Sequence, residues 1–238
     1  SRKLCSYMNS EYSDKLIMLR DKNEYKLLKL KYNEALRKMS EKIDNIYMLY
    51  AINGLPRPIE HKKMRIKSDE QIGRKLYQKG CDITVSNVYD YVGDVAGIRL
   101  VCLTKRDLEE LKVVISNDEE LVIIDEKDYV NNPKESGYMG CHLIIGVPVY
   151  TIDGKDYVKV EVQIRTLAME AWASLEEKIC YRKMVSENVR EELKRVSSVL
   201  ATVDDDINRI VIDSLEIGFG SDKTKGKDAC YVRKLQKK

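Results

Sequence analysis

The sequence predicts an α+β fold, in which a mixed β-sheet core is preceded and followed by helices. Apolar residues recur at helical spacing over about the first 50 residues and again near the end of the chain. Between them, from about residue 63 to residue 166, the apolar pattern is that of strands, with shorter helical stretches interleaved. With 238 residues, the chain is long enough to bury a substantial core around such a sheet.

Residues 1–57 form the first predicted unit, a helical arm. Its apolar side chains follow steps of three and four residues, which place them on one side of a helix, at Leu28, Tyr32, Ala35, Leu36, Met39, Ile43, Ile46, Tyr47 and Tyr50. The stretch NGLPRP, from Asn53 to Pro58, ends the arm because glycine and proline do not continue a helix.

Residues 58–183 form the predicted sheet core. We expect strands at 95–103, 120–126, 142–150 and 157–166. Helices are expected at 68–79, at about 105–116 and around Trp172. Because strands and helices alternate along this segment, we predict a mixed α/β core.

The stretch KVEVQIRT within the last strand carries the most regular alternation. Its apolar residues Val160, Val162 and Ile164 share one face of the strand. The other face then presents an acid, an amide and a guanidinium in one row, at Glu161, Gln163 and Arg165. A half-solvated strand has the same alternation, so the pattern alone leaves a purely structural role open.

The remaining residues predict a long helix and a tail. Over 184–216, one amphipathic stripe contains Val189, Leu193, Val196, Leu200, Val203, Ile207, Ile210 and Val211. Such a stripe requires a packing partner. Residues 217–238 contain few apolar and many basic side chains, which predicts a flexible basic tail.

Composition limits the class of protein. A net charge of +3, with 43% hydrophobic and 34% charged residues, is typical of a soluble globular chain. We find no apolar run near the roughly 20 residues that a membrane span needs, so we expect no membrane partner and a cytoplasmic location. The six cysteines form no CxxC pair, which argues against a zinc knuckle or a disulfide framework.

A first group of candidate residues is basic and lies around a predicted strand-to-helix turn. Arg65 and Lys67 alternate on a short strand, and Lys75 follows on a helix that Ser68 can cap. Cations around a helix N-terminus can hold a polyphosphate, although a charged segment is more often only a solvated face. Asp94 precedes the next strand, where a simple turn role remains open.

A second group lies in the loop KDYVNNPKESGYMGCH and on the row described above. Lys134, Tyr138 and His142 are displayed by turn-forming residues, and we expect Tyr138 to offer an exposed face for a base. Glu161 suits a metal ligand or a general base, with Gln163 as its hydrogen-bonding partner. A histidine at the start of a strand is often structural, so that interpretation also stays open.

The order of these motifs resembles the synthetase domain of the RelA/SpoT homologue family over about residues 63–183. The stretch QIRTLAMEAWASLEEKICYRK is similar to the small alarmone synthetases, in particular the RelQ-type group. The resemblance implies a nucleotidyltransferase-like synthetase core and GTP diphosphokinase activity. In that reaction the β,γ-diphosphate of ATP moves to the ribose 3′-hydroxyl of GDP or GTP, or of GMP, to give a guanosine alarmone of the stringent response and AMP.

The resemblance also implies roles for single residues. Asp94 and Glu161 would hold Mg²⁺, with Mn²⁺ as an alternative, and Glu161 would be the general base. The implied ATP-binding residues are Arg65 and Arg99 at the adenine and Lys67 and Lys75 at the phosphates. The implied guanine-nucleotide residues are Tyr138 as a stacking platform, with Lys134, His142 and Gln163. The family resemblance further implies a homo-oligomer, specifically a homotetramer.

The sequence departs locally from the RelQ-type pattern. Met139, Gly140 and Cys141 replace an expected Arg-Ser-aromatic run, from which we predict a preference for a shorter acceptor. The other substitutions are Gln71 for Ser, Gln78 for Arg, Glu170 for Asn or Asp, and Glu177 for His. Two alternatives remain, namely pyrophosphorylation of a tRNA 3′ end and a non-catalytic module that binds a nucleotide or RNA. Single-stranded RNA is a further candidate partner.

Overall fold

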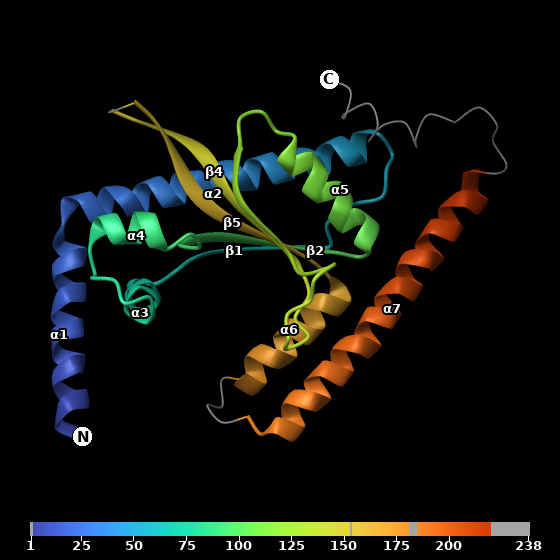
Figure 1. Ribbon diagram of the computed structural model, residues 1–238. Helices are drawn as coiled ribbons and strands as arrows, with labels where there is room; N and C mark the ends of the chain where they lie inside the picture. The colour runs from blue at the N-terminus through green and yellow to red at the C-terminus, as the bar shows by residue number, and fades with distance from the viewer. Residues whose placement is uncertain (1, 153, 181–184, 220–238) are drawn as a thin grey trace.

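The structure is a computed structural model that describes residues 2–152, 154–180 and 185–219. Its helices are α1 (Arg2–Asp21), α2 (Asn23–Ile52), α3 (Asp69–Gln78), α4 (Val85–Tyr91), α5 (Lys105–Ser116), α6 (Leu167–Cys180) and α7 (Glu187–Phe219). Its strands are β1 (His61–Ile66), β2 (Ala96–Cys102), β3 (Val122–Asp128), β4 (Cys141–Thr151) and β5 (Gly154–Thr166). Figure 1 shows helices before and after one sheet, which confirms the predicted α+β class.

The five strands form one mixed sheet in the order β1-β2-β5-β4-β3. The pair β2 and β5 is parallel, while the pairs β1/β2, β4/β5 and β3/β4 are antiparallel. The register places Gly97 beside Glu161 and Arg99 beside Gln163, and it places His142 beside Gln163 from the other side. The polar row of β5 therefore lies in the middle of the sheet, between β2 and β4.

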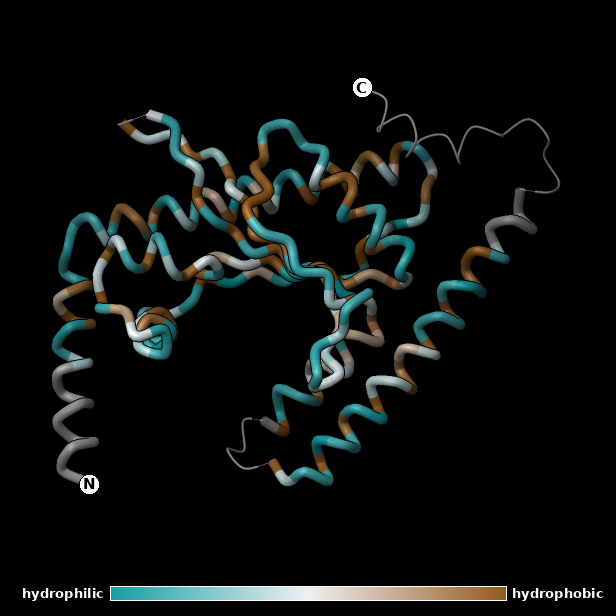
Figure 2. The backbone as a smooth tube through the Cα atoms, viewed as in Figure 1, coloured by the Kyte–Doolittle hydropathy of each residue, from teal (hydrophilic) through white to brown (hydrophobic). Residues whose placement is uncertain are grey.

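The alternation predicted for β5 is confirmed. Val158, Val160, Val162 and Ile164 are fully buried and belong to the main hydrophobic cluster. The long helix α2 contacts β2, β4 and β5, and the buried residues of its apolar side belong to the same cluster. Figure 2 shows that hydrophobic residues concentrate where the strands cross the centre of the molecule. This packing of α2 on one face of the sheet leaves the polar row on the other face.

A second, smaller cluster joins α6 and α7 to the loop before β4. It contains Tyr138, Trp172, Ala173 and Leu193. The indole of Trp172 donates a hydrogen bond to the carbonyl of Leu193 at 2.9 Å, which ties α6 to α7. Part of the predicted α7 stripe is thus covered within the chain, because Val196 and Leu200 also pack against this cluster.

Several predicted boundaries differ from the structure. The arm consists of two helices rather than one, because Lys22 has an extended backbone with φ −67° and ψ 128°. The short helix α4, capped by Thr84, was not predicted. Strand β3 runs two residues later than expected. Of the predicted tail, residues 217–219 belong to α7, and residues 220–238 lie outside the described residues.

Among the described residues, no helix is long and apolar enough to cross a membrane.

The division of the chain into an arm, a core, a helix and a tail stays a prediction.

Candidate active site

Three of the predicted residues meet at the corner between β1, α3 and β2. Asp94 lies just before β2, and its two carboxylate oxygens accept hydrogen bonds from Lys67 at 2.8 Å and from Lys75 at 2.5 Å. Burial raises the pKa of Asp94, but the two ammonium groups outweigh this effect and lower it, so the carboxylate is ionised. The corner thus holds two cations and one anion, which leaves a net positive charge for a ligand's phosphates.

Local sequence explains how α3 brings Lys75 to this corner. Ser68 caps the helix as predicted, because its hydroxyl accepts from the Gln71 backbone N–H at 3.3 Å. The side-chain oxygen of Gln71 in turn accepts from the Ser68 backbone N–H at 3.0 Å, which completes a capping box. Gln71, one of the departures from the expected pattern, therefore has a structural role at the start of the helix.

Arg65 and Arg99 lie on neighbouring strands of the same sheet face. Arg65 is opposite Gly97 in the β1/β2 register and is exposed to solvent. Its Nε lies 4.0 Å from the position that a Cβ on Gly97 would occupy, so the side chain extends over this glycine. Arg99 is half-buried on β2. The two guanidiniums predicted to enclose an adenine thus lie on adjacent strands, beside the Asp94 corner.

Glu161 is held through both of its carboxylate oxygens. His142 Nδ1 lies 3.1 Å from Oε1, and Gln163 Nε2 donates to Oε2 at 2.9 Å. Burial and the charge of Asp94 raise the pKa of Glu161, but its hydrogen bonds to His142 and Gln163 lower it below its ordinary value. Glu161 is therefore an ionised carboxylate at neutral pH, fixed in one orientation at the centre of the sheet.

His142 connects Glu161 to the loop before β4. Its second ring nitrogen, Nε2, is hydrogen-bonded to the hydroxyl of Tyr138. A neutral imidazole with its proton on Nδ1 satisfies both contacts, because it donates to Glu161 and accepts from Tyr138. The structure thus places His142 directly against the catalytic candidate, a contact that the sequence alone did not predict.

Tyr138 is not exposed, and this expectation from the sequence is wrong. Only 6% of the residue is accessible, because its ring makes edge contacts with Trp172, His142 and Tyr129. The ammonium of Lys134 lies over the Tyr138 ring at 4.8 Å from its centre. A base that stacks on this ring has to replace Lys134 there, so the role of Tyr138 as a guanine platform stays a prediction.

Two residues with central contacts were not assigned roles from the sequence. Arg165 is buried and donates to the Tyr138 hydroxyl from Nε at 3.2 Å and from Nη2 at 3.0 Å. Glu170, in the first turn of α6, accepts from Arg165 at 2.6 Å and from Arg99 at 2.9 Å. The alternation in KVEVQIRT placed Arg165 on the correct face, but no local pattern indicates that Glu170 folds back onto the sheet.

The loop that carries Lys134 and Tyr138 is anchored to α7. Ser197 donates a 2.6 Å hydrogen bond to the carbonyl of Gly137, whose φ of +95° favours glycine. Met139, where the RelQ-type pattern has an arginine, is only 7% exposed and belongs to the main hydrophobic cluster. In this structure position 139 therefore does not face the polar row.

The site offers two carboxylates as metal ligands, Asp94 and Glu161. Among the described residues, no group of three or more His, Cys, Asp and Glu side chains is arranged to hold a metal ion. Asp94 and Glu161 nevertheless supply the carboxylate oxygens that Mg²⁺ prefers, and Mg²⁺ is commonly bound by one or two carboxylates together with substrate phosphates. The donor set thus fits a metal that arrives with a polyphosphate rather than one held by protein alone.

A mixed sheet, a cationic corner and a fixed central carboxylate together give an α+β protein a site that is suited to a polyphosphate. The chain belongs to the RelA/SpoT family, since residues 64–186 match the family described as a region found in RelA/SpoT proteins. The GTP pyrophosphokinase YwaC of Bacillus subtilis is 39% identical over 178 residues, which cover 74% of this chain and 85% of that protein.

Solved structures agree with this assignment. The small alarmone synthetase 2 from Bacillus subtilis superimposes with a TM-score of 0.72 and 37% identity, covering 80% of this chain and all of that one. The small alarmone synthetase 1 from the same organism, bound to its product pppGpp, gives a TM-score of 0.73 and 29% identity over 81% of this chain and 98% of that chain. Recognition of the family from its motifs is thus confirmed.

Proposed function

We propose that this protein is a guanosine alarmone synthetase, which transfers the β,γ-diphosphate of ATP to the ribose 3′-hydroxyl of a guanine nucleotide and releases AMP. The observation that carries the proposal is the fixed, ionised Glu161 beside the cationic Asp94 corner, on one face of a sheet of this family. The relatives named GTP pyrophosphokinase and the pppGpp-bound structure support the same reaction.

The donor nucleotide binds on the β1 and β2 side of the site. Arg65 and Arg99 stack on the adenine, for which planar guanidiniums are better suited than ammonium groups. Lys67 and Lys75 leave Asp94 in part and contact the donor phosphates, because their ammonium groups already converge at that corner.

The transfer step needs one base and one leaving group. The ribose 3′-oxygen attacks the β-phosphorus of ATP, and its proton passes to Glu161 as the new P–O bond forms. The bond between the β-phosphorus and the oxygen bridging it to the α-phosphorus breaks, and AMP leaves with that oxygen. General-base assistance of this kind contributes about 10²–10⁴ in rate. Glu161 is ionised at neutral pH, so the proton-accepting form is present, although its lowered pKa makes it a weaker base than an ordinary glutamate.

Asp94 and Glu161 would hold Mg²⁺, or Mn²⁺ as an alternative, together with the donor phosphates. When bound, such an ion neutralises phosphate charge and fixes the β-phosphate for attack. The chain itself positions both carboxylates, Asp94 through Lys67 and Lys75 and Glu161 through His142 and Gln163.

The acceptor nucleotide binds on the β4 side. Tyr138 stacks on the guanine after Lys134 moves from its ring to the acceptor phosphates, where His142 contributes as well. Gln163 lies between Glu161 and Arg99 and orients the acceptor ribose. The same proposal assigns the protein to the cytoplasm, where ATP and guanine nucleotides are abundant. It also includes assembly into a homotetramer.

Product analysis tests the proposal directly. Purified protein is incubated with Mg²⁺, ATP labelled at the γ-phosphate and GMP, GDP or GTP in turn, and the products are separated by thin-layer chromatography. We expect label in a guanosine alarmone, with an equal amount of AMP. A parallel reaction with tRNA as acceptor examines the alternative of 3′-end modification, for which the comparisons offer no support. Label found only in tRNA, or in no product at all, would refute the proposal.

A further inference from the structure

Four side chains on the polar face of the sheet form a closed ring of hydrogen bonds. Arg99 and Arg165 are its two guanidiniums, and Glu170 joins them on one side by accepting from Arg99 Nη1 at 2.9 Å and from Arg165 Nη1 at 2.6 Å. Gln163 Oε1 joins them on the other side by accepting from Arg99 Nε at 3.3 Å and from Arg165 Nη2 at 3.2 Å. The ring spans β2, β5 and the first turn of α6.

The ring fixes one residue of each proposed nucleotide site. Hydrogen bonds to a guanidinium lie in its plane, so Arg99 is held by its edge while its faces stay available for stacking. Arg165 uses Nε and Nη2 to hold the Tyr138 hydroxyl. Arg99 on the donor side is therefore connected to Tyr138 on the acceptor side through two residues, Glu170 and Arg165.

Glu170 supplies the negative charge of the ring. Two guanidiniums on adjacent strands repel each other, and the repulsion is strong where water is excluded. The Arg165 side chain is 7% exposed and that of Glu170 is 25% exposed, so the pair is largely shielded from solvent. Without the carboxylate, Arg165 would be a buried charge without its charged partner, which is unfavourable enough to displace it from Tyr138.

We propose that Glu170 is a positioning residue that makes the binding of the two nucleotides mutually favourable. The proposal rests on the proposed function. The first nucleotide to bind, by stacking on Arg99 or on Tyr138, restricts the remaining motion of the closed ring. The second nucleotide then binds more tightly, because less conformational entropy is left to lose. The resulting coupling is reciprocal, so each ligand raises the affinity of the other by the same factor.

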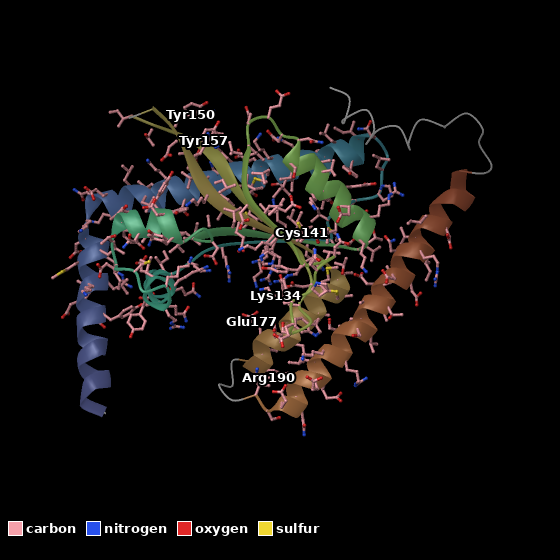
Figure 3. All side chains as sticks on the ribbon, viewed as in Figure 1. Lys134, Cys141, Tyr150, Tyr157, Glu177 and Arg190 are labelled. Atoms are coloured by element: carbon pink, nitrogen blue, oxygen red, sulfur yellow. The ribbon has the colours of Figure 1, made fainter. Side chains whose placement is uncertain are left out.

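Isothermal titration calorimetry with the full chain measures this coupling. A non-hydrolysable ATP analogue and GDP are titrated with Mg²⁺, each alone and each in the presence of a saturating amount of the other. The variants are Glu170→Gln, which removes the charge, and Glu170→Asp, which keeps the charge but is too short to reach both guanidiniums. Glu177→Gln, an exposed residue on the same helix that Figure 3 labels, is the matched control. Thermal unfolding verifies that each variant is folded.

In the wild type and in Glu177→Gln, we expect each ligand to lower the Kd of the other by a factor in the range of about 5–150. In Glu170→Gln this factor should fall to about one, and Glu170→Asp should lie between the two. Turnover should show the same effect as a higher KM for both substrates with a smaller change in kcat.

Unchanged coupling in a folded Glu170→Gln variant that still makes product would overturn this inference and leave the proposed function intact. If Glu170→Gln does not fold, full wild-type coupling in Glu170→Asp overturns the inference in the same way. Failure of the wild type to bind either nucleotide would instead contradict the proposed function and the inference together.

Discussion

Glu161 is constrained at the scale of single atoms, since one oxygen contacts His142 and the other accepts from Gln163. Both contacts stabilise the ionised form and leave lone pairs of the carboxylate for a hydroxyl proton. An amide at this position would be unfavourable, because its NH₂ group would point at either His142 Nδ1 or Gln163 Nε2, which are both hydrogen-bond donors. The surroundings of Glu161 therefore favour a carboxylate specifically, which a polar residue on a half-solvated strand would not need.

Glu161→Gln should lower kcat by a factor of about 10²–10⁴, because an amide cannot take the proton of the ribose hydroxyl. Calorimetric binding of a non-hydrolysable ATP analogue should change far less, since the donor contacts proposed for Arg65, Lys67 and Lys75 stay in place. Glu119→Gln, the same chemical change at an exposed turn residue, serves as the control and should resemble the wild type. Wild-type turnover in Glu161→Gln would show that another group is the base.

Sequence alternation was sufficient to place Glu161, Gln163 and Arg165 on one face, because a strand's period of two is a local property. The environment of Tyr138 could not be predicted in this way. Its burial depends on Trp172 and on the contact of α6 and α7 with the loop, which are tertiary features. The contact of Lys67 with Asp94, 27 residues apart, was not predicted either, because the family resemblance gave these two residues separate roles.

At the scale of elements, α7 supports the site without contributing to the sheet. It holds the loop of Tyr138 through Ser197 and it holds α6 through Leu193. A periodic stripe predicts such a helix from sequence, but it does not say which of its residues meet which partner. The unpredicted elements have weaker signals, since α4 has only seven residues and the break at Lys22 involves neither glycine nor proline.

Gly137→Ala should loosen this support. At φ +95° a Cβ is strained, and it would stand 2.8 Å from Cβ of Ser197, so the loop has to move away from α7. We expect a loss of about 1–3 kcal/mol in the free energy of unfolding. The KM for the guanine nucleotide should rise, while that for ATP stays near the wild-type value. Urea unfolding and steady-state kinetics measure both effects.

Gly54→Ala separates backbone strain from the contact with α7. Gly54 also has a positive φ, of +68°, but no atom lies within 4 Å of the position of its Cβ. This variant should lose some stability and keep its KM values. An equal rise in the guanine-nucleotide KM for both variants would argue against a specific role of the loop anchor.

Asp204 joins α7 to the end of β5. It is only 1% exposed, its Oδ2 accepts a 2.8 Å hydrogen bond from Thr166, and its Oδ1 has no partner among the described residues. Burial raises the pKa of Asp204, although the hydrogen bond from Thr166 and the charge of Lys105 act in the opposite direction. A buried carboxyl with one unpaired oxygen is therefore more favourable in its protonated form.

The sign of the pH effect follows from this raised pKa. Below the unfolded pKa of about 3.9 both states are protonated, and the folded state has its full stability. As the pH rises toward the folded pKa, the unfolded state ionises first, and that stability is lost. Asp204→Asn cannot ionise and keeps an acceptor for Thr166. Its stability advantage over the wild type should therefore grow as the pH rises from about 4, by about 1.4 kcal/mol for each unit by which the folded pKa exceeds the unfolded one.

Urea unfolding of the wild type and of Asp204→Asn at several pH values measures this difference directly. Asp213→Asn is the control, because Asp213 is an exposed carboxylate on the same helix and does not contribute to the pKa shift of Asp204. A constant difference between the wild type and Asp204→Asn across this pH range would mean that Asp204 does not titrate there.

At the scale of the whole molecule, α7 also has an apolar side that the described residues leave exposed. Val199, Val203 and Ile210 are exposed by 52%, 43% and 63%. Steps of four and seven residues place them on one side of the helix, away from Leu193 and Trp172. Figure 1 shows α7 at the edge of the molecule. Exposed apolar stripes of this kind are typical of association surfaces.

We therefore expect the chain to form a homo-oligomer in solution, and Val203→Glu to weaken it. A carboxylate in the middle of the stripe would be buried without a partner in the assembly, which is unfavourable by several kcal/mol. Multi-angle light scattering should give a mass well above 27.6 kDa for the wild type and a value near 27.6 kDa for the variant at low micromolar concentration. Thr202→Glu adds the same charge at the preceding position, about 100° around the helix from Val203, and should leave the mass of the oligomer unchanged. If the wild type itself had the mass of one chain, the stripe would not be an interface between copies, and the exposed side of α7 would face solvent.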